Sequence, residues 1–296
     1  MKSEAKAKLG VIISMFIYGT IGIFVRNIPL PSSVISMVRG LIGAPFLLLV
    51  LAVKKQKLNI PAIRRNLKYL LISGALLGFN WILLFEAYRY TTVATATLCY
   101  YLAPIIIVVL SPIIFKEKLT VKKVLCILAA IVGMYFVSGM ASGGLPQLSE
   151  LKGVLLALGA ALLYAMIVIT NKMLRDLPAY DKTIFQLALS ALVLLPYNLF
   201  TGSFQGFTIS GASLLFLLAL GVIHTGVAYL LYFGSMDALP SQTLAILSYI
   251  DPLVAVLVSA FILREAVGAG EFFGAALILG AALISELPER KKIKQE

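Results

Sequence analysis

The chain alternates between long apolar stretches and short polar or glycine- and proline-containing turns. A helix that crosses ~30 Å of hydrocarbon needs roughly 20 apolar residues, and ten stretches come close to this length. The pattern therefore predicts an all-α membrane protein with ten transmembrane helices and little chain left for a soluble domain. The expected spans are residues 9–25, 32–53, 67–89, 92–115, 121–139, 151–171, 182–200, 211–236, 241–263 and 268–287.

The two halves of the chain resemble each other at a constant offset of 148 residues. Over residues 85–117 this offset gives 8 identities in 33 ungapped positions. Each half holds five expected spans, an odd number, so the two copies must face opposite ways across the bilayer. We therefore expect two inverted five-helix repeats, residues 1–147 and 148–296, an architecture typical of secondary transporters with a binding site near the midplane. The matched residues are Phe85, Thr95, Tyr101, Pro104, Val108, Ser111, Ile114 and Glu117, with Phe233, Thr243, Tyr249, Pro252, Val256, Ser259, Ile262 and Glu265.

Composition supports a membrane class, and charge sets the expected orientation. The chain is 60% hydrophobic and 13% charged, with a mean hydropathy of +0.99. Its net charge of +12 is the difference between 25 Lys and Arg residues and 13 Asp and Glu residues. If the N-terminus is cytoplasmic, 20 of the 25 fall on the cytoplasmic side of the predicted topology. This asymmetry predicts two cytoplasmic termini and accounts for the net charge without a nucleic-acid partner.

Other chemistries find no support in the sequence. The two cysteines, Cys99 and Cys126, lie in expected helices and indicate neither a disulfide framework nor a metal site. The chain has no HExxH, Walker A or GxSxG motif. We therefore expect no cofactor, no metal, no ATP-driven step and no enzymatic activity.

The repeat motifs resemble the EamA branch of the drug/metabolite transporter superfamily. The matching segments are LAPIIIVVLSPIIFKEKLT with Gly133 downstream, and IDPLVAVLVSAFILREAV with Gly274 and Gly280. Tyr18-Gly19 with Arg26, and Tyr164-Ala165 with Lys172, resemble the start of each EamA unit. The second half reads REAVG, which departs from the usual pattern. The resemblance covers nearly the whole chain and implies export of small metabolites, with a site between the first, third and fourth helices of each half.

Repeat-matched residues invite a structural interpretation first. Pro104 and Pro252 fall near the middle of expected helices, and each frees the carbonyl four residues earlier, that of Tyr100 or Ser248. These kinks either bend a helix around its neighbours or act as hinges beside the substrate. Glu117 and Glu265 lie next to basic residues at the membrane boundary, where a solvated ion pair is the expected role.

Charged residues that break the repeat indicate function more directly. At this offset Arg39, Glu86, His224 and Asp251 stand opposite the uncharged Leu187, Gly234, Leu76 and Ala103. An ionisable group within a span is a functional candidate by default. From a rise of ~1.5 Å per residue, Arg39 and Glu86 lie nearer the outer side and could form a gate. His224 and Asp251 fall near the midplane, where they could couple transport to protons. The alternatives are an interfacial Glu86–Arg89 pair and plain hydrogen bonds between helices for the others.

Aromatic and amide side chains lie at similar depth. A tyrosine well inside a span must find a polar partner or face water. We therefore expect a wet, aromatic-lined cavity for a small amphipathic solute. With His224 and Asp251, the expected substrate-binding residues are Tyr18, Asn80, Trp81, Tyr101, Tyr164, Tyr229 and Tyr249, with Thr20 adding a hydrogen bond.

The function that these features predict is export of amino acids or related small solutes by alternating access, with or without proton coupling. One alternative is exchange or import of phosphorylated or nucleotide-sugar metabolites, although only Arg39 supplies a basic residue inside a span. A membrane-embedded lipid enzyme or flippase accessory is a second alternative. Because the inverted copy is already in the chain, we expect a monomer in the lipid bilayer of a cell, with a small molecule as its partner.

The charge asymmetry makes a topological prediction. Single cysteines introduced by Lys57→Cys and Lys292→Cys should resist an impermeant thiol reagent in intact cells, because both positions are expected on the cytoplasmic side. A cysteine introduced by Ser203→Cys should react. Labelling at position 57 or 292 with protection at 203 would reverse the proposed orientation.

Overall fold

A computed structural model of the chain describes residues 2–116, 119–138, 147–205, 209–236 and 238–287. Within these ranges the regular structure is entirely helical. Two positions named above, Glu117 and Lys292, lie outside the described residues.

Among the described residues, seven helical stretches are long and apolar enough to cross a membrane, where the sequence predicted ten spans. They cover Glu4–Arg26, Ser32–Val53, Leu67–Tyr90, Val93–Ile114, Leu148–Asn171, Ala179–Phe200 and Gly211–Ser235, and two shorter apolar helices cover Ile246–Ile262 and Ala269–Ser285. The elements are α1 (Lys2–Gly19), α2 (Ile21–Arg26), α3 (Ser32–Val53), α4 (Ile60–Arg65), α5 (Leu67–Tyr90), α6 (Val93–Tyr100), α7 (Ala103–Ile114), α8 (Val121–Val137), α9 (Leu148–Asn171), α10 (Ala179–Phe200), α11 (Gly211–Gly221), η2 (Val222–Val227), α12 (Ala228–Met236), α13 (Ser241–Ser248), α14 (Ile250–Leu257), η3 (Val258–Ile262) and α15 (Ala269–Glu286), where η marks a π-helical segment.

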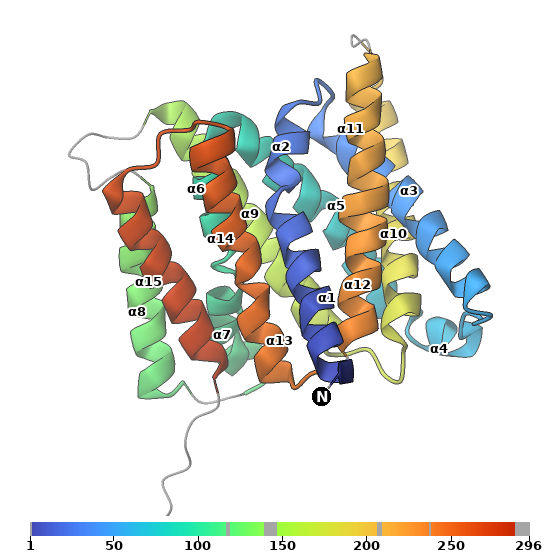
Figure 1. The fold of residues 1–296 in the computed structure, drawn as a ribbon. Helices are drawn as coiled ribbons and strands as arrows, with labels where there is room; N and C mark the ends of the chain where they lie inside the picture. Colours follow the sequence, from blue (N-terminus) through green and yellow to red (C-terminus); the bar gives the residue numbers. More distant parts are fainter. Residues whose placement is uncertain (1, 117–118, 139–146, 206–208, 237, 288–296) are drawn as a thin grey trace, which may run out of the picture.

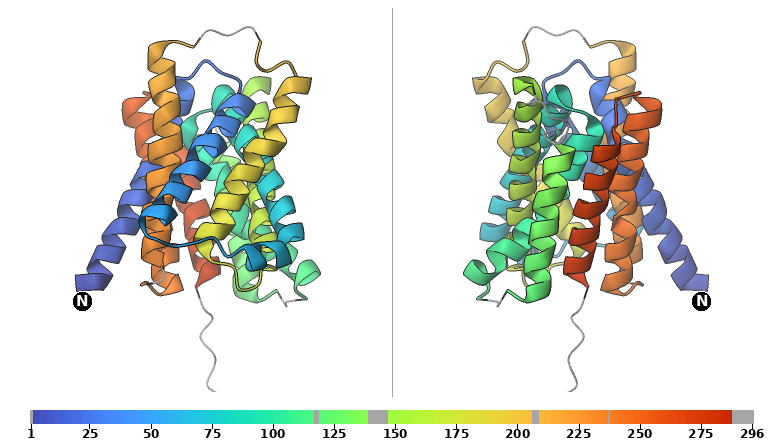
Figure 2. Two further views of the ribbon diagram at one scale, coloured as in Figure 1. Left: turned by 90° about the vertical axis from the view of Figure 1, so that its right-hand side faces the viewer. Right: turned by 90° about the vertical axis from the view of Figure 1, so that its left-hand side faces the viewer.

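The helices form one bundle in which the two halves of the chain are interleaved (Figures 1 and 2). The most extensive packing joins α5 to α9, α8 to α15, and α3 to α10, so each of these pairs takes one helix from each half. Helices α8 and α15 pack against each other at one side of the bundle. We call the face where α1 begins the N-face, and the other the opposite face (Figure 1).

Two apolar helical segments, one of membrane length and one shorter, are interrupted within the bundle. Helix α6 ends at Tyr100 and α7 begins at Ala103, while α13 ends at Ser248 and α14 begins at Ile250. Pro104 and Pro252 lie in the first turn of the second piece, where a missing N–H costs least. Backbone groups near the breaks need partners other than the regular helical ladder, so breaks at this depth are tolerated only inside a bundle.

Close helix contact at one side depends on glycine. Gly133 in α8 and Gly274 in α15 face each other, and a Cβ at Gly274 would lie 2.6 Å from the carbonyl oxygen of Gly133. Gly280 on the same helix has no heavy atom within 4 Å of its would-be Cβ. Small residues therefore let the two backbones approach.

This contrast predicts opposite effects of one substitution. Gly274→Ala should destabilise the folded protein by ~1–3 kcal/mol, the usual cost of overpacking. Gly280→Ala should leave stability unchanged or raise it, because alanine is the better helix former. Thermal unfolding of both variants in the same detergent measures this, and equal shifts would contradict the packing interpretation.

Candidate functional site

The centre of the bundle holds a hydrogen bond between the two halves at the level of the helix breaks. The Tyr101 hydroxyl donates to Asp251 Oδ2 at 2.7 Å. It also lies 3.4 Å from the Ser248 carbonyl oxygen, the group that Pro252 frees. The sequence placed Tyr101 and Asp251 in a common site, and the structure brings their side chains into contact.

Aromatic rings surround this pair. Tyr101 packs against Tyr249 with ring centroids 6.1 Å apart, and Tyr100 packs against Tyr164 at 5.4 Å. The Tyr100 hydroxyl lies 3.4 Å from Asn80 Oδ1. Asn80 itself is fully buried and donates to the Ala160 carbonyl at 2.6 Å. This amide therefore fastens α5 to α9, so its contacts are those of a structural residue at the edge of the cluster.

Tyr18 of α1 and Tyr229 of α12 form a second aromatic group. Their rings meet edge to face at 5.8 Å. The Tyr18 hydroxyl is buried and has no hydrogen-bond partner among the described residues. A tyrosine hydroxyl left unpaired within a membrane bundle is costly, so this group is a candidate for contact with a ligand.

Arg39 is buried, with 3% of its surface exposed. Its guanidinium carbon lies 4.2 Å from the centre of the Trp81 ring and 5.4 Å from that of Phe85. Its Nε donates to Thr225 Oγ1 at 3.0 Å. Stacking on desolvated aromatic rings is worth ~2 kcal/mol, which offsets only part of the cost of a cation inside a membrane.

The π-helical segment η2 positions two polar side chains. His224 Nε2 lies 3.1 Å from Thr20 Oγ1, and Nδ1 lies 3.3 Å from the Ala219 carbonyl oxygen. Thr225 donates to the carbonyl of Leu220, five residues back. The wider turn thus aims one residue at α1 and the next at Arg39, which fits the frequent occurrence of π-turns at functional sites. The described contacts of His224 do not include Asp251.

The structure does not bring Glu86 to Arg39. Glu86 lies 3.6 Å from Arg89 in an i,i+3 pair and accepts a hydrogen bond from Ser32 at 2.7 Å. The Glu86 side chain is 31% exposed, whereas Arg39 is buried. The structure therefore contains the Glu86–Arg89 pair, which the sequence analysis gave as the alternative to a gate formed by Glu86 and Arg39.

A polar clasp on the opposite face joins the halves at Glu265. The Glu265 carboxylate lies 2.5 Å from Arg26 of α2 and accepts the Val93 backbone N–H at 2.8 Å and the Ser259 hydroxyl. Its side chain is only 12% exposed. The sequence indicated a solvated boundary residue here, so the structure corrects that expectation, because α2 and the first residue of α6 enclose the carboxylate. The repeat partner Glu117 lies outside the described residues.

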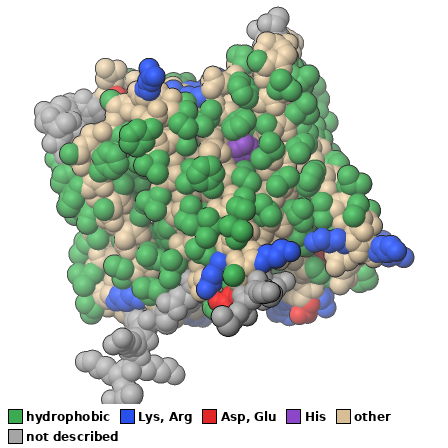
Figure 3. Space-filling model, in the orientation of Figure 1, with side chains coloured by type: hydrophobic (Ala, Val, Ile, Leu, Met, Phe, Trp, Pro, Cys, Tyr) green, Lys and Arg blue, Asp and Glu red, His purple; other side chains and the backbone are tan. Residues whose placement is uncertain are grey.

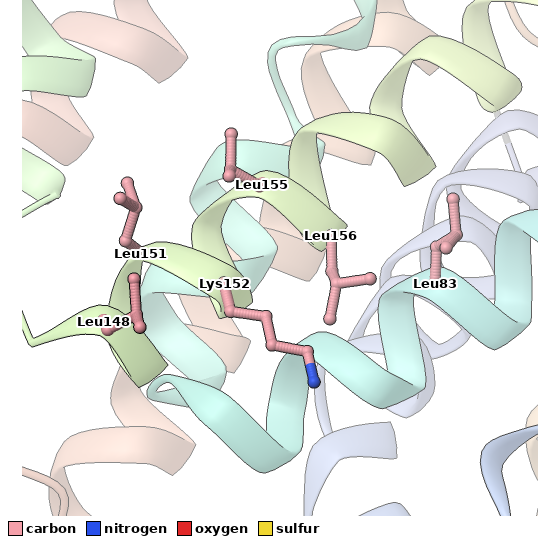
Figure 4. A pocket seen from close by; sticks show the side chains of 6 residues that line it. All are labelled: Leu83, Leu148, Leu151, Lys152, Leu155 and Leu156. Atoms are coloured by element: carbon pink, nitrogen blue, oxygen red, sulfur yellow. The ribbon is translucent and has the colours of Figure 1, made fainter.

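Two of the hollows on the bundle surface are lined by described residues near the features above. A broad one of about 780 Å³ lies at the opposite face and is lined by the clasp residues Arg26 and Glu265 together with Glu150, Glu271 and Arg89. A shallow apolar one lies along α9 (Figure 4), where leucines and the stem of Lys152 line it. Lys152 places its ammonium 3.9 Å from the centre of the Tyr90 ring. The second hollow has the apolar lining of a lipid-facing groove.

Two contacts escaped the sequence interpretation. Thr225 as the acceptor for Arg39 has no sequence signal beyond its place beside His224, because a π-turn does not follow regular helical spacing. The clasp had a weak signal, since Arg26 and Glu265 carry opposite charges at the same predicted depth. The other candidate residues lie in the contacts given above.

Comparison with known proteins identifies the family. The family model described as "EamA-like transporter family" matches residues 5–139 and 151–286. An uncharacterized transporter of Bacillus subtilis, YxxF, is 32% identical over 257 residues, which are 86% of this chain and 81% of that protein. An uncharacterized transporter of Archaeoglobus fulgidus is 28% identical over 277 residues, covering 93% and 94% of the two chains.

A relative with a named activity and a solved structure are also similar to this chain. The aromatic amino acid exporter YddG of Ancylobacter novellus is 27% identical over 219 residues, covering 74% of this chain and 75% of that one. A crystal structure matches 95% of this chain and 97% of its own with a TM-score of 0.63 and 20% identity, a likeness of fold alone. With both halves matched by the family model, the chain belongs to the EamA-like transporter family and is a multi-pass protein of the cell membrane.

Proposed function

We propose that this protein is a secondary transporter that exports small metabolites, amino acids or related amphipathic solutes, by alternating access. The observation that carries the proposal is the Tyr101–Asp251 hydrogen bond of 2.7 Å, made between the halves where two helices are broken. A half-buried carboxylate at this depth needs a partner that is mobile or wet. A transported solute or proton is such a partner.

The proposed topology has ten spans, in repeats 1–147 and 148–296, with both termini cytoplasmic. The two separate family matches support the division into halves. Figure 3 supports the orientation, since basic side chains gather along the edge of the N-face and few lie on the opposite one. On the positive-inside rule the N-face is cytoplasmic. One chain already holds both repeats, so a monomer is the proposed unit.

Helix packing supports an arrangement closed toward the opposite face. Helix α6 packs against α14 there, and the Glu265 clasp joins α2, η3 and α6. Toward the N-face, α7 packs against α9 while α13 packs against α1. Rocking of the halves about the breaks at Tyr101 and Tyr249 would open the clasp and release solute into the hollow above it.

The aromatic cluster bears on the substrate. Rings of Tyr18, Trp81, Tyr100, Tyr101 and Tyr229 offer stacking surfaces for an amphipathic solute, and a relative carries the name aromatic amino acid exporter. A phosphorylated substrate would need several cations, whereas Arg39 is the one buried Lys or Arg among the described residues. Amino acid export is therefore the preferred assignment.

Transport by purified protein in proteoliposomes tests this function. Wild-type protein should move labelled phenylalanine faster than empty vesicles do, with a rate that depends on pH. Asp251→Asn should still bind the solute, although more weakly because a negative charge is lost, and it should lose the pH dependence because an amide exchanges no proton. Asp181→Asn is the control, since Asp181 is also buried but accepts a hydrogen bond from the Asn59 backbone at the N-face. An unchanged pH profile in Asp251→Asn would remove this residue from coupling.

The clasp makes a separate prediction about stability. Glu265→Gln should lower the stability of the state described here by ~1–3 kcal/mol, because it removes a charge from partly buried hydrogen bonds. Glu86→Gln should cost at most ~1 kcal/mol, since its ion pair is more exposed. Thermal unfolding of Glu265→Gln, Arg26→Met and the double variant completes a mutant cycle, and strictly additive effects would show that the two side chains do not interact.

A further inference from the structure

Arg39 lacks a charged partner in a place where a cation needs one. The four ion pairs of the described residues involve other side chains, and the guanidinium lies over the rings of Trp81 and Phe85. With 3% of its surface exposed, Arg39 is also largely shielded from water. Ring stacking lowers the cost of this burial without supplying the negative charge that would neutralise it.

The hydrogen bonding of Arg39 leaves one edge of the guanidinium for a ligand. Among the described residues, Arg39 donates one side-chain hydrogen bond, from Nε to Thr225, so both terminal nitrogens keep their donors. Thr225 is itself fixed by its bond to the Leu220 carbonyl in the π-turn. A planar fork of donors, stacked on rings and held at one nitrogen, matches the two oxygens of a carboxylate.

A second observation comes from α1. The Tyr18 hydroxyl is buried without a hydrogen-bond partner among the described residues. The segment η2 links this region to Arg39, because Thr225 accepts from Arg39 and the adjacent His224 lies 3.1 Å from Thr20, two residues after Tyr18. An unpaired O–H donor and an unpaired cation therefore lie in the same region, and an anionic group would satisfy both.

We propose that Arg39 is the carboxylate-binding residue of the transport site, assisted by the Tyr18 hydroxyl, and that the substrate class is solutes bearing a carboxylate. This assignment rests on the proposed transport function and narrows it. Asp251 lies in the other half of the chain and accepts a hydrogen bond from Tyr101. Its carboxylate supplies the negative charge for an ammonium group. The two charges together select a zwitterionic amino acid over an amine or an amide.

Trp81 provides a direct readout of this site. It is the single tryptophan in the chain, and its ring stacks on Arg39. A carboxylate bound to the guanidinium changes the electric field at the indole, so its fluorescence should shift when phenylalanine is added to detergent-purified protein. Phenylalanine itself does not absorb where tryptophan is excited. Binding is thereby measured without relying on transport.

The test compares probes that differ only at the carboxylate. Phenylalanine and leucine should each bind wild-type protein about tenfold or more tighter than phenylalaninamide and leucinamide, the loss expected for a charge-assisted hydrogen bond. Arg39→Gln should abolish this preference, and Arg39→Lys should retain part of it, because the charge stays but the fork is lost. Arg65→Gln, which removes an exposed cation at the end of α4, should leave the preference intact.

Three results separate the possible failures. Equal binding of acids and amides, or an unchanged preference in folded Arg39→Gln, would overturn the carboxylate assignment. Transport of phenethylamine or the amides without the amino acids would overturn it as well but leave a transporter. Absence of transport and binding for every probe would overturn the proposed function together with this inference. Size-exclusion profiles establish that each variant is folded, and Thr225→Val tests the positioning of Arg39 where Arg39→Gln does not fold.

Discussion

Every polar group in a membrane bundle needs an internal partner, because hydrocarbon offers none. In this protein most backbone N–H and C=O groups find their partners within unbroken helices, and the exceptions lie at the centre of the bundle. There two helices are interrupted, one turn is widened into a π-helix, and side chains complete the hydrogen bonding. Tyr101 reaches the carbonyl of Ser248 and the carboxylate of Asp251, and Thr225 receives Arg39. The interior can hold such irregular backbone only because it is enclosed by both repeats.

The two halves divide the work between scaffold and chemistry. Residues matched by the 148-residue offset, such as Pro104 and Pro252, break corresponding helices in each half. Residues that depart from it carry the charges. Arg39 stacks on rings in α5, whereas the residue at its repeat position is the apolar Leu187. The neighbouring Gln186 donates to Ser73 and Asn171 at 2.6 and 2.8 Å, as an ordinary tie between helices. A symmetric scaffold around an asymmetric charge pattern suits a solute whose two ends differ.

Charges at the membrane boundary have more than one role. The Glu86–Arg89 pair is local to a single helix and partly exposed. Glu265 instead joins segments that are 239 residues apart in the chain and accepts the N–H of Val93, at the start of α6. A carboxylate at a helix N-terminus is favoured by the helix dipole as well as by hydrogen bonding. This clasp therefore stabilises closure on one face, and its loss on rocking would have to be balanced by new contacts elsewhere.

The sequence by itself determined the helical membrane class, because hydrophobic length and periodicity are local properties. Of its ten predicted spans, seven helical stretches of the described residues have membrane length. The sequence also placed Tyr101, Asp251 and the aromatic rings at a common depth. Only the tertiary structure decided which partners they have. Depth along a helix does not give the direction in which a side chain points, so Glu86 pairs with Arg89 and not with Arg39. The π-turn that presents Thr225 to Arg39 depends on packing between α3 and η2, and the enclosure of Glu265 depends on α2 and α6. Contacts of this kind join residues far apart in the chain, and no pattern in a single sequence encodes their distance.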